Sequence, residues 1–289
     1  MNDETVGIAL VVASAVGFGT LGIFGVIAAD AGLTIPTVLA LRFGLASVAV
    51  WAVLWHRGTF RLPSGRILAI AFALGAGGYA TQSALYFFGL EFMSAGMVAI
   101  VLYTYPAFVV CLTALLHPER VTPALVGALG LSIGGVALVT GVDPVGVDPR
   151  GVLVVLGAAF AYSLYIIVSQ RALTTVDAET LTAFVLPAAA TSFFVFGIGT
   201  GRLAMPVGAT AWGSVLAIAI LATVVPVLTF FAGIAKIGAS RASIISTAEP
   251  GVTVALGALV LGESVSGVTL VGGSLVVAGV ILIQREGTV

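Results

Sequence analysis

The segments PAFVVCLTALLHPE (residues 106–119) and PGVTVALGALVLGE (residues 250–263) are related copies of one pattern. The offset of 144 residues between Pro106 and Pro250 holds without a gap when the copies are extended to residues 86–139 and 230–283. Matches of Ala, Val and Leu carry little weight in so apolar a chain. The matched Pro, Glu and Gly residues weigh more, because each needs a particular backbone or solvation environment. A repeat of half the chain predicts duplication and fusion, which in membrane proteins is typical of transporters.

The composition places the chain in a lipid bilayer. It is 60% hydrophobic and 8% charged, and its mean hydropathy is +1.22, which a soluble globular surface would not tolerate. Stretches without any charged residue are long enough to cross about 30 Å of hydrocarbon as helices, and they cover residues 5–29, 67–90, 121–142, 151–170 and 264–284. The net charge of −1 argues against a broad basic surface for nucleic acid. A lone cysteine, Cys111, excludes a disulfide framework and is expected in the core.

The sequence predicts an all-α integral membrane protein with ten transmembrane helices. We expect them near residues 5–29, 35–55, 67–90, 94–116, 123–141, 151–170, 180–200, 209–235, 241–261 and 266–284. The connections are short and contain turn-forming residues. The segment 142–150, rich in Asp and Pro, is the natural joint between two five-helix halves, residues 1–145 and 146–289.

The distribution of basic residues predicts the orientation. With ten spans, one side carries both termini together with Arg57, Arg61, Arg66, Arg120, Arg171, Lys236, Arg241 and Arg285, whereas Arg150 and Arg202 fall opposite. Cytoplasmic loops are enriched in Lys and Arg, so both termini should be cytoplasmic. Because each half has an odd number of spans, the two repeats are inverted around a central cavity, which can then open alternately to either side.

A polar and aromatic stripe marks the third span. Tyr79, Gln82, Ser83 and Tyr86 are spaced i, i+3, i+4 and i+7, so they share one helix face. The ninth span repeats this spacing at positions 243, 246, 247 and 250, and the offset of 144 residues pairs further aromatic positions. We expect these faces to meet at the central cavity and to bind a small amphipathic molecule. The expected lining is Phe18, Tyr79, Gln82, Ser83, Tyr86, Tyr103, Tyr162, Phe230, Ser243, Ser246 and Thr247.

The polar stripe has a second interpretation. Ser, Thr and Gln also join neighbouring membrane helices through hydrogen bonds, and for any single Ser or Thr this role is favoured. For Gln82, flanked by Tyr79 and Tyr86, ligand contact is favoured, because an amide has four hydrogen-bonding positions that are easier to satisfy beside a wet cavity.

Prolines and ionisable residues inside the spans indicate function as well. The matched Pro106 and Pro250 predict either hinges that bend as the pathway closes or static kinks. Arg42 and Glu249 lie several residues inside their spans, where charges are costly. We expect a mutual ion pair or pairing with free carbonyl groups, and the alternative for Glu249 is proton coupling.

Residues near the ends of the spans favour structural roles. Glu119 and Glu263 precede the next helix, whose N-terminus stabilises a carboxylate. Lys236 and Arg241 are a topology signal or attract a substrate carboxylate. The fifth and tenth spans carry small residues in matching register, Gly130 and Gly134 with Ser274 and Ala278, and serve as scaffold or as a dimer face. The protein is therefore expected to be a monomer or a homodimer in the lipid bilayer.

The sequence contains no reactive cluster that would indicate an enzyme. His56 and His117 lie in separate connections, and no Asp-rich diphosphate motif, His-Glu metal motif or phosphate-binding glycine loop occurs. We therefore expect no catalytic residue, no metal and no cofactor.

Several segments together resemble the EamA family of the drug/metabolite transporter superfamily. They are ASAVGFGT (residues 13–20), ALRF (residues 40–43), the first copy with Pro106, Glu119, Gly127 and Gly135, and the second with Glu249, Pro250, the LGE of residues 261–263, Gly272 and Gly279. The resemblance covers essentially the whole chain. It implies a basket of ten helices in two inverted halves and export of small metabolites across a bacterial inner membrane. Within the family the chain looks most like amino-acid exporters of the YddG kind, although His117 and Pro118 replace the Leu and Gly that precede the second Glu.

We therefore expect an exporter that moves neutral amino acids, aromatic ones included, out of the cytoplasm by alternating access. Gln82 and the hydroxyl groups of the ninth span would bind the ammonium and carboxylate ends. Efflux of organic cations would instead need Glu249 to face the cavity, and a phosphorylated cargo would need Arg42, Lys236 or Arg241 there. A membrane scaffold or receptor subunit would have a dry, filled centre.

Overall fold

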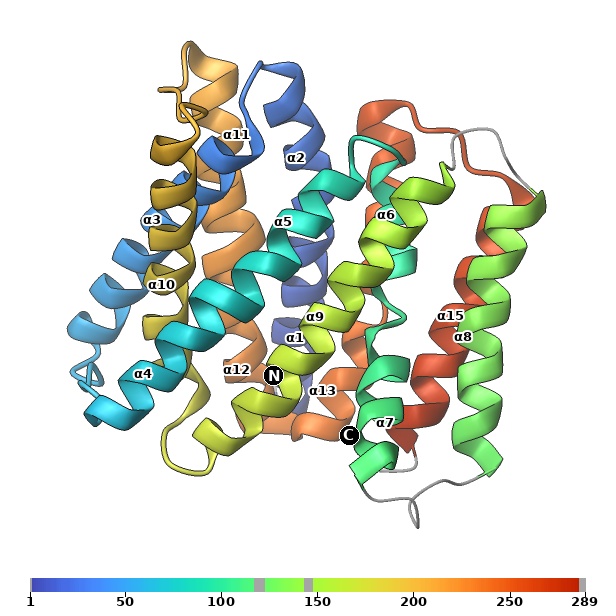
Figure 1. Ribbon diagram of the computed structural model, residues 1–289. Helices are drawn as coiled ribbons and strands as arrows, with labels where there is room; N and C mark the ends of the chain where they lie inside the picture. The colour runs from blue at the N-terminus through green and yellow to red at the C-terminus, as the bar shows by residue number, and fades with distance from the viewer. Residues whose placement is uncertain (1, 117–122, 143–147, 286–289) are drawn as a thin grey trace.

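The computed structural model describes residues 2–116, 123–142 and 148–285, and every regular element within these ranges is a helix (Figure 1). His117, Pro118, Glu119, Arg120 and the predicted boundary between the halves lie outside the described residues.

The helices follow the ten predicted ranges within a few residues. The first five ranges correspond to α1 (Asp3–Gly19) with α2 (Leu21–Asp30), α3 (Ile35–His56), α4 (Gly65–Ala73) with η1 (Leu74–Tyr79) and α5 (Ala80–Gly89), α6 (Ala95–Leu102) with α7 (Tyr105–Leu116), and α8 (Pro123–Val142). The last five correspond to α9 (Pro149–Leu173), α10 (Ala178–Gly199), α11 (Ala209–Ala219) with η3 (Ile220–Val224) and α12 (Val225–Ile237), α13 (Ala239–Ser246) with α14 (Glu249–Leu256) and η4 (Gly257–Leu261), and α15 (Gly267–Arg285).

The described part of the chain is a multi-pass membrane protein. Nine of its helical spans are long and apolar enough to cross a membrane, and within α8 a shorter apolar stretch covers Val126–Val139. Capping side chains fix where several helices begin. The side chains of Thr34 and Asp177 accept the backbone N–H groups of Thr37 and Thr180, three residues on, as N-caps do.

Among the residues that the structure describes, three of the spans are interrupted. The break at Thr20 separates α1 from α2, and the Thr20 hydroxyl donates to the Gly17 carbonyl at 2.6 Å. The other two breaks, after Leu102 and after Ser246, are equivalent under the offset of 144 residues. Pro106 and Pro250 lie directly behind them, in the first turns of α7 and α14, where the missing N–H of proline has no helical partner to lose.

Two π-helical segments occupy similar positions in the third and eighth spans. They are η1, ending at Tyr79, and η3, which contains Thr223, the residue equivalent to Tyr79. The Thr223 hydroxyl donates to the Ile218 carbonyl at 2.8 Å, five residues back. Such π-segments often occur at functional sites, and the hydropathy pattern did not predict them.

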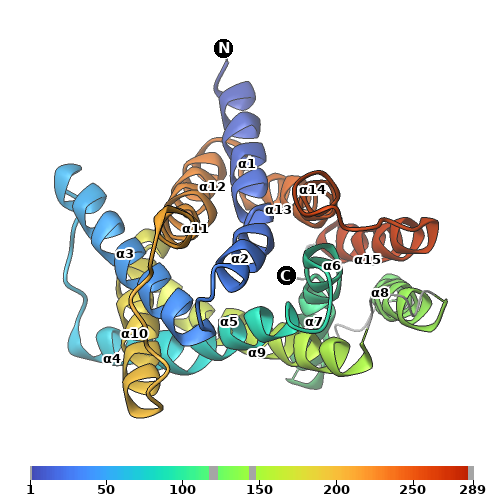
Figure 2. The same ribbon diagram turned by 90° about the horizontal axis from the view of Figure 1, so that it is seen from above.

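α8 and α15 pack against each other at one edge of the molecule (Figures 1 and 2). The close approach uses Gly135 and Gly279, where an added Cβ would lie 2.5 Å from the Gly272 carbonyl oxygen and 2.7 Å from the Ala128 carbonyl oxygen, respectively. At Gly130 and Gly134, the small residues that we expected at a packing face, an added Cβ would have no neighbouring atom within 4 Å. Small residues therefore do bring these helices together, but from a neighbouring face.

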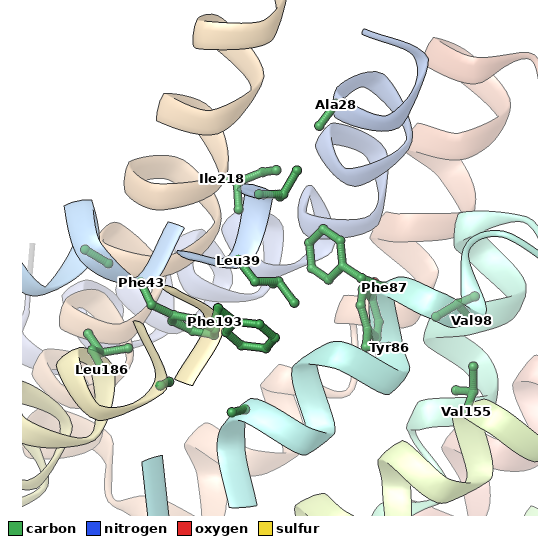
Figure 3. Close-up of a cluster of buried hydrophobic side chains, with 14 of the residues drawn as sticks. Ala28, Leu39, Phe43, Tyr86, Phe87, Val98, Val155, Leu186, Phe193 and Ile218 are labelled. Carbon is green, nitrogen blue, oxygen red and sulfur yellow. The ribbon is translucent and has the colours of Figure 1, made fainter. Parts of the chain in front are cut away.

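An aromatic cluster joins α3 to η1 and α10, and Figure 3 shows its buried members Phe43 and Phe193. The Phe43 ring is fully buried, stacks on Phe193 with ring centroids 6.0 Å apart, and lies 5.4 Å from the Tyr79 ring. This packing fixes the neighbouring Arg42. Cys111, which we expected in the core, is instead exposed on the surface of α7.

Candidate substrate site

The interhelical cavity has a volume of about 310 Å³ and is lined by residues from both halves of the chain. Eight of the eleven residues predicted to line a central cavity lie on its wall, namely Phe18, Tyr79, Gln82, Ser83, Tyr86, Tyr103, Tyr162 and Phe230. Arg42 and Glu249 line it as well.

The cavity extends toward one side of the molecule. Ser169, Leu173, Ala178 and Leu181, which also line it, belong to the end of α9 and the beginning of α10. In Figure 1 the connection between these helices lies at the lower edge of the view, on the side where α15 ends.

Tyrosines dominate the wall. The chain contains six tyrosines, and all six line this cavity. Five of the rings form a continuous chain with centroid separations of 4.8–6.0 Å, in the order Tyr79, Tyr165, Tyr162, Tyr105 and Tyr103. Sequence reasoning missed Tyr105 and Tyr165, although the helical spacing of three residues between Tyr162 and Tyr165 was a signal for the latter.

Gln82 supplies the amide of the site. Its side chain is buried, and its Oε1 accepts a hydrogen bond from the Ser83 hydroxyl at 3.1 Å. An amide can both donate and accept hydrogen bonds, so Gln82 adds both kinds of group to the wall for a polar ligand.

A hydrogen bond to Thr223 and two aromatic rings hold Arg42 beside the cavity. Its Nε donates to the Thr223 hydroxyl at 3.0 Å. Its guanidinium carbon lies 4.7 Å from the centre of the Phe43 ring and 5.9 Å from that of Phe87, distances at which cations and aromatic faces attract. The π-helical turn in η3 thus provides the Thr223 hydroxyl that orients a cation inside the membrane.

Glu249 begins α14, directly behind the break in the ninth span. The Tyr103 hydroxyl lies 2.9 Å from its Oε2 and 2.8 Å from the Ser246 carbonyl oxygen, so it can donate to either. The broken helix therefore presents a carboxylate and a phenol together on the cavity wall.

The predicted ion pair between Arg42 and Glu249 is not formed. Within the described ranges the ion pairs join Arg57 to Glu179, Lys236 to Asp3, and Arg241 to Glu4. Thr223 and Tyr103 bind the two cavity charges instead.

Lys236 and Arg241 lie outside the cavity wall. Each is paired with an acid at the start of α1, at 2.6 Å and 2.7 Å respectively. These contacts tie the beginning of α1 to the end of α12 and to α13.

The predicted hydroxyl groups of the ninth span do not face the cavity. Ser243, Ser246 and Thr247 are not part of its lining. The Ser246 and Thr247 hydroxyls donate to carbonyls of their own helix, those of Ala242 at 3.0 Å and Ile244 at 2.6 Å. Ser and Thr hydroxyls on helices commonly donate to a carbonyl three or four residues earlier. The stripe on the ninth span therefore does not line the cavity, although its spacing equals that of the stripe on the third span.

The sequence pattern of the EamA-like transporter family matches residues 5–141 and again residues 149–285. The chain belongs to this family. It is accordingly a membrane transporter of the EamA type, and its two matched segments lie on either side of residues 142–148.

Relatives of this EamA-type chain are named as transporters. An uncharacterized transporter, YdfC of Bacillus subtilis, is 26% identical over 97% of this chain and 92% of its own length. A probable terminal-alkyne amino-acid exporter of Streptantibioticus cattleyicolor is 27% identical over 85% of this chain and 82% of its own length. A protein of known crystal structure shares the fold, with a TM-score of 0.68 at 23% identity and 98% of both chains covered.

Proposed function

We propose that this EamA-family transporter exports neutral amino acids, aromatic ones included, from the bacterial cytoplasm by alternating access. The observation that carries the proposal is the gathering of all six tyrosines on one cavity wall together with Gln82. Phenol and amide groups on a wall of aromatic and aliphatic side chains suit a small molecule with a polar end and an apolar side chain. The relative named as an amino-acid exporter supports the same cargo class.

Alternating access follows from the proposed architecture of ten spans in two inverted repeats, residues 1–145 and 146–289, with both termini in the cytoplasm of a bacterial inner membrane. The equivalent breaks in the fourth and ninth spans support it, as does the double match to the family pattern. In this arrangement Pro106 and Pro250 are hinges, and the cavity extends toward the cytoplasmic side.

Counterflow in proteoliposomes tests the function. Vesicles containing the purified chain and loaded with unlabelled phenylalanine should accumulate labelled phenylalanine from outside, and Tyr79→Ala and Gln82→Ala should slow the accumulation at least several-fold. Phe72→Ala is the matched control, because Phe72 is an aromatic residue of the same span that is 53% exposed and lies outside the cavity wall. Absence of accumulation with phenylalanine and threonine would overturn the proposal, and wild-type rates in both cavity variants would remove these residues from the site.

Efflux of drugs or organic cations is the second candidate, because Glu249 does face the cavity. Arg42 on the same wall opposes a cationic cargo through like-charge repulsion. Inhibition of phenylalanine counterflow by tetraphenylphosphonium at equal concentration would favour this candidate. A membrane scaffold or receptor subunit has no use for the cavity, and measured counterflow would exclude it as the sole role.

A further inference from the structure

Two opposite charges line the same cavity without neutralising each other. Arg42 is 2% exposed, and Glu249 is half-buried within its span. Neither Arg42 nor Glu249 forms an ion pair within residues 2–116, 123–142 and 148–285. Charged side chains inside a membrane protein are costly and usually mark a substrate or ion pathway. Their retention without direct pairing therefore points to a ligand that carries both complementary charges.

Residues 17–19 of α1 contact both the segment that holds Arg42 and the segment that begins with Glu249. A Cβ at Gly17 would lie 2.8 Å from the Leu221 carbonyl oxygen, in the π-helical segment that holds Arg42 through Thr223. A Cβ at Gly19 would lie 3.4 Å from the carbonyl oxygen of Glu249 itself. η3 and the start of α14 thus contact α1 on either side of Phe18, whose side chain lines the cavity.

Each charged group on the cavity wall has more hydrogen-bonding positions than the bonds to Thr223 and Tyr103 occupy. The bond from Arg42 to Thr223 uses Nε, whereas the terminal nitrogens of a guanidinium form the fork that binds a carboxylate with two parallel bonds. The bond from Tyr103 occupies Oε2 of Glu249, and a carboxylate accepts further bonds at both oxygens. Tyr103, whose hydroxyl lies 2.9 Å from Glu249, and the Tyr105 ring, 5.9 Å from that of Tyr103, line the same cavity, and aromatic rings attract cations.

We propose that Arg42 and Glu249 form the charge-recognition pair of the site, with Arg42 binding the α-carboxylate and Glu249, assisted by Tyr103, binding the α-ammonium group of a zwitterionic substrate. This inference rests on the proposed amino-acid export and assigns the polar ends that sequence reasoning had given to Gln82 and the ninth span. The tyrosine wall is then left for the substrate's side chain.

Binding of truncated ligands to the detergent-purified full-length chain tests the pair. The ligands are phenylalanine, phenylalanine amide, which lacks the carboxylate, and 3-phenylpropionate, which lacks the ammonium group. The wild-type chain should bind phenylalanine about tenfold or more tightly than either analogue, because a hydrogen bond to a charged group contributes about that much. Arg42→Gln should remove the preference for phenylalanine over its amide and largely keep the preference over phenylpropionate. Glu249→Gln should do the reverse.

The outcomes separate the pair from the function. If the wild-type chain binds none of the three ligands, the proposed function fails. If it binds phenylalanine but both variants weaken all three ligands equally, the charge assignment is overturned while amino-acid binding stands. Arg42→Lys and Glu249→Asp keep the charges, so both variants should still bind phenylalanine more tightly than either analogue. They test the assignment even where Arg42→Gln does not fold. Loss of the preferences in these conservative variants would also contradict it.

Discussion

The carboxylate of Glu263 accepts the backbone N–H of Ala95 at 2.7 Å, although 168 residues separate them. Its second oxygen accepts the N–H of Gly96 at 3.3 Å. The second copy of the repeat thereby caps α6, a helix of the first copy, on the side opposite the one toward which the cavity extends (Figure 1). We expected this carboxylate to interact with the helix that follows it, α15. The helix-end role is retained, but the helix lies in the other half of the chain.

Removing this cap should destabilise the protein. Glu263→Ala leaves two N–H groups of α6 without their acceptor, and charge-assisted bonds contribute about 1.5–3 kcal/mol each in favourable settings. We expect a melting temperature several degrees below wild type in detergent. Glu179→Ala is the control, because its ion pair with Arg57 is 3.7 Å long and partly exposed and should contribute about 0–1 kcal/mol. Equal melting temperatures for the two variants would contradict the capping role.

Gly262 should be sensitive to any side chain. Its φ of +68° is the left-handed conformation that lets the chain turn before Glu263, and it costs other residues about 1–2 kcal/mol. Gly262→Ala should therefore lower the melting temperature. In contrast, Gly130 lies within a helix, and a Cβ added there has no neighbouring atom within 4 Å. Gly130→Ala should therefore leave the free energy of unfolding unchanged or raise it by up to about 1 kcal/mol. A Gly262→Ala protein as stable as Gly130→Ala would refute this account of the turn.

Packing of α8 against α15 should depend on one glycine face only. Gly279→Leu would force a side chain against the Ala128 carbonyl and the Ser132 hydroxyl, and we expect it to separate the helices and lower the yield of monodisperse protein. Gly134→Leu introduces the same side chain into open space and should be tolerated. Size-exclusion profiles and melting curves measure the effect of each variant. A Gly134→Leu protein that is less stable than Gly279→Leu would show that the helices pack through a different face.

The Tyr103 hydroxyl should matter for transport independently of its ring. Tyr103→Phe keeps the aromatic wall but removes the bond to Glu249, and loss of a bond of about 1–1.5 kcal/mol should weaken phenylalanine binding roughly five- to tenfold. Tyr165→Phe is the matched control, since this phenol lines the same wall but is not bonded to Glu249. Similar affinities of the two variants would separate Tyr103 from recognition.

The prolines behind the two equivalent breaks should affect rate more than stability. Pro106→Ala and Pro250→Ala each restore a backbone N–H in the first turn of α7 or α14, which favours a continuous helix across the break. The double variant should fold with an unchanged or higher melting temperature and transport phenylalanine more slowly. Undiminished counterflow in that variant would leave the prolines as static kinks.

Hydropathy predicted the helical ranges well, because bilayer thickness fixes the length of an apolar helix. It could not predict where the helices break or widen, since Thr20 and the π-helical turn at Thr223 depend on local hydrogen bonds that leave the apolar pattern unchanged. We expected Gly134 of α8 to face α15, whereas the neighbouring Gly135 makes the contact. Several glycines share that helix, and only the packing selects one of them.

The composition of the cavity wall was also partly predictable. Polar and aromatic spacing located Tyr79, Gln82 and Tyr86, because such groups are rarely placed toward lipid. The same reasoning failed for Ser246 and Thr247, whose hydroxyls can bond to their own helix. The expected partnership of Arg42 with Glu249 failed because a neighbouring hydroxyl binds each of them.

A crystal structure with bound 4-bromophenylalanine would show where the substrate lies, because the anomalous signal of bromine locates the ligand. We expect one bromine peak against the tyrosine wall, with the amino-acid end of the ligand between Arg42 and Glu249. A peak in the separate apolar groove lined by Val254 and Ser274, or an empty cavity at a ligand concentration that saturates binding in solution, would contradict it.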